Sequence, residues 1–225
     1  MSTTGTNGGV DAVIDAARSF VSAEEGAVRD VVDQIDETFV RVASLVLNST
    51  GMVVLTGAGT SGFTAARSAH LLSVTGTPAY FLNPTNGLHG SMGSLRPDDV
   101  MIALSKGGSS GEVNELALRV ATQGVKVVAL TSNAESPLAA SADIAVTFRP
   151  FPPADPGSLI AMGSTLAHSA WLDALAVVLM RARQYPWDRV QYIHPGGAVG
   201  KVPALPPAVE ALDIPVMPLN EKLRN

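Results

Sequence analysis

The sequence contains no cysteine among its 225 residues. This absence excludes disulfide frameworks, thiolate metal sites, iron–sulfur clusters and a catalytic thiol. Cationic residues are also few, with 15 Lys and Arg against 20 Asp and Glu, and they form no run of five or more. Because a basic patch is missing, we expect no binding to nucleic acid and none to an anionic membrane surface.

Long hydrophobic runs are missing as well. The strongest apolar stretch, 169–180, is short and contains Asp173, whereas a membrane-spanning helix needs about 20 apolar residues. Residues 1–9 are polar and contain neither the basic segment nor the apolar core of a secretion signal. We therefore expect a flexible leader over 1–9 and a cytoplasmic protein.

Apolar runs typical of buried strands alternate with segments of helical periodicity. Helices are expected at 63–74, 112–122 and 137–141. Five short runs rich in β-branched and apolar residues are predicted to be strands, at 52–56, 79–82, 100–104, 125–130 and 144–148. Short connections between strands that are apolar throughout are typical of a parallel sheet. The pattern predicts an α/β fold in which helices sandwich a five-stranded parallel sheet.

The segment that precedes the first strand is predicted to be helical. Apolar residues recur at helical spacing over 10–47, which indicates either two helices or one helix broken near Gly26. These apolar helices are expected to extend beyond the sandwich and to pack on a partner chain.

The region after the last strand changes composition twice. Four prolines at 149–158 predict a surface loop, and a long helix is expected to follow at 159–183. Five prolines at 202–219 predict a tail that wraps the surface or is disordered. We therefore expect a single domain over 10–201 and a proline-rich tail over 202–225.

Two loops rich in glycine and hydroxyl groups follow the first and third predicted strands. The first loop, 57–62, reads Gly-Ala-Gly-Thr-Ser-Gly, and the second loop, 105–111, reads Ser-Lys-Gly-Gly-Ser-Ser-Gly. In open α/β sheets, ligands bind at the carboxyl ends of the strands, where helix N-termini offer free N–H groups. Hydroxyl groups, flexible backbone N–H groups and one lysine together suit a phosphate monoester.

The sequence disfavours nucleotide binding at these two loops. The first loop has the spacing G-x-G-x-x-G, but 80–83 reads Tyr-Phe-Leu-Asn, so the acidic partner of a ribose hydroxyl is missing. The second loop lacks the G-x-x-x-x-G-K-[ST] order of a triphosphate site. Helix capping alone explains a single loop of this composition, but two such loops in one sheet favour a binding site. We expect no cofactor, and the candidate phosphate-binding residues are Gly59, Thr60, Ser61, Ser105, Lys106, Ser109, Ser110 and Thr131.

The order of several motifs carries a resemblance to a known family. Besides the two loops, the matching stretches are 73–79, 88–93, 173–176 and 194–200, of which the last, His-Pro-Gly-Gly-Ala-Val-Gly, is the most specific. Over about 24–201 the chain resembles the sugar isomerase (SIS) domain family, and most closely its arabinose-5-phosphate isomerase branch. The resemblance implies a flavodoxin-like fold and a homo-oligomer, commonly a tetramer, which binds a sugar phosphate between subunits. It also implies that the phosphate lies against Ser61, Ser105 and Ser110.

The chain departs from that branch at three functional positions. The branch has a lysine in its first loop, a glutamate in its second and a glutamate before the long helix, where this sequence has Thr60, Ser109 and about Pro153. CBS domains, which often follow the SIS domain, are not expected in the 25 residues after Gly200. These departures keep open a second interpretation, a non-catalytic module that binds and senses a phosphosugar.

Four residues are candidates for the chemistry of an aldose–ketose isomerisation, which needs a base that moves a proton between C1 and C2 and a donor for the carbonyl oxygen. The resemblance implies that His194 enters the site from a neighbouring subunit and that His89 contacts the sugar or opens its ring. Glu112 opens a helix, where it acts as a base or simply favours the helix dipole. His168 follows Ser164 by four residues, on the same helix face, and is the fourth candidate.

Two further classes of chemistry find little support in the sequence. The spacings H-x-x-x-H, H-x-H and E-x-x-H do not occur, so we expect no metal and a metal-independent enediol reaction. The nucleophile spacing G-x-S-x-G occurs at 107–111, but it lies within the second loop, whose composition we assign to phosphate binding, so a hydrolase is disfavoured. A lyase or an epimerase acting on the same class of ligand stays open.

Overall fold

The computed structural model of the chain describes residues 7–219. Its five strands are parallel and form one sheet in the order β2-β1-β3-β4-β5. Their bounds are β1 Val53–Gly57, β2 Ala79–Phe81, β3 Val100–Leu104, β4 Lys126–Thr131 and β5 Ile144–Thr147. The α/β prediction is confirmed, and the strand order is the flavodoxin-like one.

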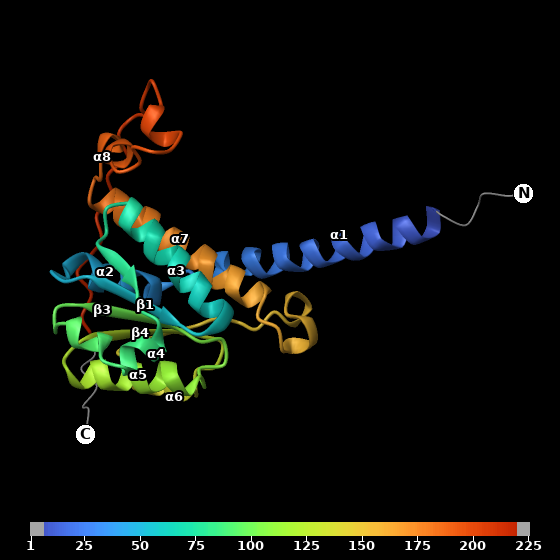
Figure 1. Cartoon of the computed structure of the whole chain (residues 1–225), viewed down its shortest axis with the longest axis horizontal. Coiled ribbons are helices and arrows are strands. Elements are labelled where there is room, and N and C mark those ends of the chain that lie inside the picture. The colour runs from blue at the N-terminus through green and yellow to red at the C-terminus, as the bar shows by residue number, and fades with distance from the viewer. Residues whose placement is uncertain (1–6, 220–225) are drawn as a thin grey trace, which may run out of the picture.

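Helices cover both faces of the sheet (Figure 1). One face packs against α2 (Glu37–Asn48), α3 (Gly59–Val74) and α7 (Gly163–Ala182). The other carries α4 (Pro84–Leu88), α5 (Gly111–Thr122) and α6 (Pro137–Ser141). Along β1, Val53 and Leu55 face the first layer and Val54 faces the second. The strands are apolar throughout because both of their faces are covered.

The N-terminal region forms two helices, and the break between them differs from the one expected near Gly26. The first helix, α1 (Asn7–Asp30), is continuous over 24 residues. Gly26 lies against the ring of Phe151, where a Cβ would come within 2.7 Å of Cζ, so this glycine permits close packing instead of ending the helix. The break lies at 31–36, and Asp36 caps α2 by accepting a hydrogen bond from the Thr38 N–H.

The expected leader overlaps this helix. Because α1 begins at Asn7, residues 7–9 are helical, while residues 1–6 lie outside the described part of the chain. Figure 1 shows that the first part of α1 extends well beyond the sandwich. Short 3-10 helices complete the irregular segments, namely η1 Val32–Gln34, η2 Ser91–Ser94, η3 Pro152–Ala154, η4 Pro156–Ser158 and η5 Val199–Lys201.

Helix α7 is the central helix of its layer. By length and composition alone it is long and apolar enough to cross a membrane, and half of its most apolar window is buried. Trp171, Leu175 and Leu179 are completely buried against the sheet and its covering helices. The packing therefore explains the hydropathy of α7 as that of a core helix.

The tail wraps the surface over its described part, 202–219, which contains neither helix nor strand. After α7 the chain forms α8 (Trp187–Tyr192), and the Trp187 indole donates to the carbonyl of Pro207 at 2.8 Å. Further on, the Met217 N–H donates to Ser44 Oγ at 2.9 Å, and Leu219 packs against the core.

Candidate functional site at the carboxyl edge of the sheet

The two hydroxyl-rich loops lie side by side. Strands β1 and β3 are neighbours in register, with Gly57 opposite Leu104, so both loops leave the sheet at the same level. The strand order reverses at β1 and β3, which is where open α/β sheets bind ligands. We call this end of the sheet, with the loops that follow its strands, the carboxyl edge.

The first loop runs directly into α3. Its glycines allow a tight turn, since a Cβ on Gly62 would lie 2.7 Å from the Gly57 carbonyl oxygen. Gly59 has a positive φ of 54° and is exposed, as is Thr60, whereas Ser61 is buried. The N–H groups of the first helical turn have no partner within the helix, so this turn presents donors at the carboxyl edge.

The second loop is shaped by hydroxyl contacts and one special glycine. Ser105 Oγ and Ser110 Oγ lie 3.2 Å apart, within hydrogen-bonding distance, and Ser109 is exposed. Gly108 has a φ of 66°, and a Cβ there would come within 2.0 Å of Ser136 Oγ. Only glycine fits this position, so the path of the loop depends on it.

Thr131, at the end of β4, supports the second loop from behind. Its hydroxyl donates to the Lys106 carbonyl at 3.1 Å, and the Ser132 N–H donates to the same oxygen at 2.8 Å. Thr131 is completely buried. The structure therefore places Thr131 beneath the Lys106 backbone, where it stabilises the loop.

The side chain of Lys106 reaches across to the loop that precedes α7, which we call the α7 loop (149–162). Its ammonium lies 2.8 Å from Asp155 Oδ2 and donates to the Ser158 carbonyl at 3.0 Å. The other oxygen of Asp155 accepts the N–H groups of Met162 at 2.9 Å and Ser164 at 3.1 Å. Asp155 thus ties the second loop to the start of α7.

Asp155 is 3% exposed and ionised. Burial alone would raise its pKa, but the hydrogen bonds from Lys106 and from the backbone of Ser164 and Met162 hold the pKa below its ordinary value. Asp155 is not among the residues that the sequence predicts for the site, since the prolines of 149–158 predict only a surface loop. An Asp ahead of a helix is a capping signal, but Asp155 precedes Gly163 by eight residues, beyond the reach of local capping rules.

His168 lies in the second turn of α7, on the inner side. Its ring is completely buried and lies 4.6 Å from the Phe148 ring, and neither of its nitrogens has a hydrogen-bond partner among the described residues. Burial lowers its pKa to about 4, against an opposing effect of the charge on Asp155. The imidazole is therefore neutral, and in this conformation it is enclosed by protein.

The other three catalytic candidates are dispersed. Glu112 is exposed in the first turn of α5, next to the second loop, and His89 is exposed at the end of α4. His194 lies between α8 and η5, where its Nδ1 is 2.7 Å from the Val190 carbonyl oxygen. Helix α7 begins at the carboxyl edge, and α8 lies beyond its far end (Figure 1). The 20 residues of α7 span about 30 Å. Within one chain, His194 therefore lies far from the two loops.

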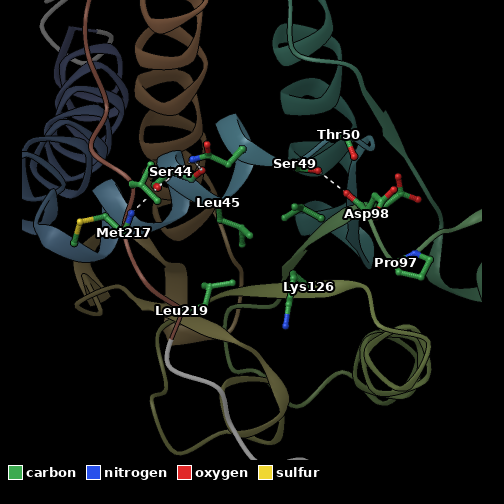
Figure 2. Close-up of a pocket in the computed structure, with 13 residues that line it drawn as sticks. Ser44, Leu45, Ser49, Thr50, Pro97, Asp98, Lys126, Met217 and Leu219 are labelled. Atoms are coloured by element: carbon green, nitrogen blue, oxygen red, sulfur yellow. Dashed lines mark hydrogen bonds between the residues drawn. The ribbon is translucent and has the colours of Figure 1, made fainter.

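The opposite end of the sheet, which we call the amino edge, contains a cavity of about 280 Å³ (Figure 2). Ser44, Asp98, Lys126 and the tail residue Met217 are among the side chains that line it. Among residues 7–219, no three His, Asp or Glu side chains are grouped as ligands for a metal ion. The hydroxyl and glycine chemistry that suits a phosphate is concentrated at the carboxyl edge.

These features define a doubly wound α/β protein with a candidate ligand site at the switch point of its sheet. Residues 47–178 match the family model of the SIS domain, and the chain belongs to this family. The resemblance stated from the sequence is therefore confirmed.

Relatives of known name are similar over most of this chain. It is 35% identical over 188 residues to arabinose 5-phosphate isomerase KdsD of Pseudomonas aeruginosa, covering 84% of this chain and 58% of that protein. It is 35% identical over 182 residues to arabinose 5-phosphate isomerase KpsF of Escherichia coli, covering 80% of this chain and 57% of that protein. The chain thus spans less than two thirds of the length of these relatives.

Two solved structures share the fold over nearly their whole length. A candidate sugar-phosphate isomerase from Listeria monocytogenes has a TM-score of 0.79 and 32% identity, covering 83% of this chain and 98% of that one. A protein of Escherichia coli CFT073, solved in complex with a sugar phosphate, has a TM-score of 0.78 and 27% identity, covering 87% and 100%.

Proposed function

We propose that the protein is a phosphosugar aldose–ketose isomerase that works through an enediol and without a metal. The observation that carries this proposal is the pair of hydroxyl-rich loops that lie side by side at the switch point of the sheet. Membership of the SIS domain family supports it. The similarity to arabinose 5-phosphate isomerases and to a protein solved with a bound sugar phosphate indicates the ligand class.

In this proposal the phosphate is bound by the two loops. Ser61, Ser105 and Ser110 supply hydroxyl donors, and the N-termini of α3 and α5 supply backbone N–H groups. Thr60, Ser109 and Lys106 stand at the rim of the same loops, of which the first two are exposed. The sugar then extends from the phosphate across the carboxyl edge.

The reaction moves two protons, from C2 to C1 and from O2 to O1, and shifts the C=O double bond from C1 to C2. A base removes the proton from C2 of the aldose while the C1 carbonyl oxygen gains a proton, which gives an enediol; the O2 hydroxyl then loses its proton as C1 gains one. Glu112 is the candidate base nearest the second loop. His89, His194 and His168 are the other candidates, and for His168 the α7 loop must first open, since the ring is enclosed.

A homo-oligomer with sites shared between subunits is part of the proposal, and a tetramer is favoured. In this proposal a neighbouring chain supplies His194, because this residue follows α8, beyond the far end of α7 from the loops of its own chain. The projecting helix α1 exposes Val10, Val13 and Val21, an apolar surface that suits a partner. We place the protein in the cytoplasm.

The reaction is tested by proton NMR in D2O on four- to seven-carbon aldose and ketose phosphates, with protein and a chelator present. Loss of the C1 or C2 proton signal, together with new product signals, is expected for one aldose–ketose pair. Products of bond cleavage or of inverted stereochemistry would instead identify a lyase or an epimerase. Persistence of every proton signal would contradict the isomerase proposal.

Site sharing is tested by mixing two inactive variants. We expect His194→Ala and Ser105→Ala each to lack activity, and a co-expressed mixture to recover part of it, because some shared sites then receive both intact residues. Activity that never exceeds that of the separate variants, or a monomer by light scattering, would contradict sharing.

A second candidate function is a non-catalytic phosphosugar sensor. It is favoured by Thr60, Ser109 and about Pro153, which stand where the resemblance to the arabinose-5-phosphate isomerase branch implies a lysine and two glutamates. This candidate predicts line broadening of a bound sugar phosphate in the same NMR experiment, without proton exchange. It also predicts thermal stabilisation by the ligand.

A further inference from the structure

The ion pair between Lys106 and Asp155 differs from an ordinary surface pair. The Asp155 side chain is 4% exposed and the Lys106 side chain 26% exposed. Removing two charges from water is costly, so such a pair persists only where further hydrogen bonds satisfy it. Here the Met162 and Ser164 N–H groups satisfy Asp155, and the Ser158 carbonyl satisfies Lys106.

The ammonium retains one unused donor. Lysine carries three N–H groups, and within the described part of the chain two acceptors meet this one, Asp155 Oδ2 and the Ser158 carbonyl oxygen. The side chain is still 26% exposed, which leaves room for a ligand beside it. The Lys106 backbone is fixed as well, by the donors of Thr131 and Ser132.

Fixing a lysine in advance changes what it contributes to binding. A free lysine loses rotamer entropy when it meets a phosphate, which weakens its contribution to binding. A lysine already held by Asp155 has lost that freedom during folding. Asp155 also cancels the positive charge, so its benefit to a ligand comes from orientation and not from added attraction.

We propose that Asp155 is a positioning residue for phosphate recognition, which holds the Lys106 ammonium beside the second loop with one N–H left for a phosphate oxygen. The inference rests on the proposed function, since it assigns a role within that phosphate site. It adds the α7 loop to the site, because Asp155 links Lys106 to the first turn of α7.

The test is a double-mutant cycle on phosphate affinity, measured by phosphorus NMR titration with inorganic phosphate and with arabinose 5-phosphate. Asp155→Asn removes the charge but keeps an oxygen that can accept the Met162 N–H. We expect it to raise the Kd about fivefold, because the released Lys106 side chain must then lose rotamer freedom when it meets the phosphate. Lys106→Met is expected to raise the Kd about tenfold through the loss of one charge-assisted hydrogen bond, and the double variant no further than Lys106→Met.

Ser164→Ala provides the matched control. It removes the Ser164 hydroxyl, which lies 3.3 Å from Asp155 Oδ1, but leaves the pairing with Lys106 intact. We expect a lower melting temperature and an unchanged Kd. Where turnover is present, Asp155→Asn should raise KM and leave kcat within twofold, a split that a general loss of folding would not give.

Two results would overturn the inference while leaving the proposed function intact. One is wild-type affinity in Asp155→Asn. The other is an Asp155→Asn effect that persists at full size in the Lys106→Met background, because Asp155 would then act without Lys106. If Asp155→Asn does not fold, Asp155→Glu takes its place, with the same expected dependence on Lys106. A wild-type protein that binds neither probe would instead overturn the proposed phosphate site, and this inference with it.

Discussion

Two buried aspartates, Asp99 at the amino edge and Asp155 at the carboxyl edge, are used differently. A third carboxylate, Asp143 at the amino edge, lies 3.6 Å from the Lys126 ammonium, which is a longer contact to a more exposed lysine than the Asp155 pair. At the amino edge, Asp99 accepts the N–H groups of Met52 at 2.7 Å and Arg96 at 2.8 Å, so its oxygens hold backbone to backbone. At the carboxyl edge, Asp155 also accepts backbone N–H groups, but its second oxygen holds a lysine side chain. Asp99 therefore joins backbone segments only, whereas Asp155 also holds a partly exposed lysine side chain.

The two edges also differ in shape, because the amino edge contains a cavity. It has a volume of about 280 Å³, and the tail crosses it at Met217 and Leu219 (Figure 2). Hydroxyl groups and Lys126 line this cavity as well, but the two loops that combine glycines with hydroxyl groups follow β1 and β3 at the carboxyl edge. We therefore place the candidate site by the chemistry at the ends of the strands and not by the cavity.

The largest effect is expected from a pair of glycine variants, one at each edge. Gly108→Ala combines a positive φ with a Cβ 2.0 Å from Ser136 Oγ, and should lower the free energy of unfolding by about 4 kcal/mol. Gly51→Ala at the amino edge meets the Asp98 carbonyl oxygen at 2.5 Å, and should cost about 2 kcal/mol.

Urea unfolding and phosphate titration together measure both variants. Binding of inorganic phosphate should be lost in Gly108→Ala and retained in Gly51→Ala, wherever both proteins remain folded. Equal loss of binding in the two variants would show that the edges are not functionally distinct.

The next effect is the dependence of stability on pH through His168. Its pKa is about 4 in the folded chain and about 6.5 when unfolded. Between these values the unfolded state binds more protons, so stability falls as the pH drops from 6.5 to 4. The loss reaches about 3 kcal/mol below pH 4. His168→Leu should remove this slope in urea unfolding measured from pH 7 to 4. A slope that is unchanged in the variant would contradict the assignment.

Much of the fold could be predicted from the sequence because its signals are local. A strand covered on both faces must be apolar throughout, and the apolar run of β3 predicts its observed bounds, Val100–Leu104. The two loops are recognisable because glycine and hydroxyl residues directly follow strands. Of the two alternatives for 10–47, two helices is confirmed and one helix broken near Gly26 is wrong. Gly26 instead allows close packing against the ring of Phe151, far away in the sequence.

The candidate site could be predicted only in part. The sequence places the loops correctly at one edge, but the enclosure of His168 depends on Phe148 and on the packing of α7. The Asp155–Lys106 pair joins two loops that no local pattern connects. Contacts of this kind are fixed by tertiary packing, so residue type and spacing do not reveal them.

A moderate effect is expected when the chain is ended at Asp213. This removes Ile214 and Leu219, which pack partly buried against the core, and the bond from the Met217 N–H to Ser44 Oγ. The free energy of unfolding should fall by about 2 kcal/mol, for the lost apolar burial and one hydrogen bond. Phosphate affinity should stay within twofold, because the tail docks at the amino edge. A large loss of affinity would link the tail to the site.

The smallest effect is expected at the ion pair of Arg67 with Asp173, which joins α3 to α7. Its two hydrogen bonds, 2.8 and 2.9 Å long, have good bidentate geometry. The two side chains, however, are 51% and 39% exposed, so water and salt screen the attraction and the coupling energy should be about 0.5 kcal/mol. Arg67→Ala, Asp173→Ala and the double variant measure it by urea unfolding at low and at high salt. The Lys106–Asp155 pair, with a nearly enclosed carboxylate, should couple several times more strongly and depend less on salt. Equal coupling at the two pairs would mean that burial does not distinguish them, and would weaken the case that Asp155 holds Lys106 in place.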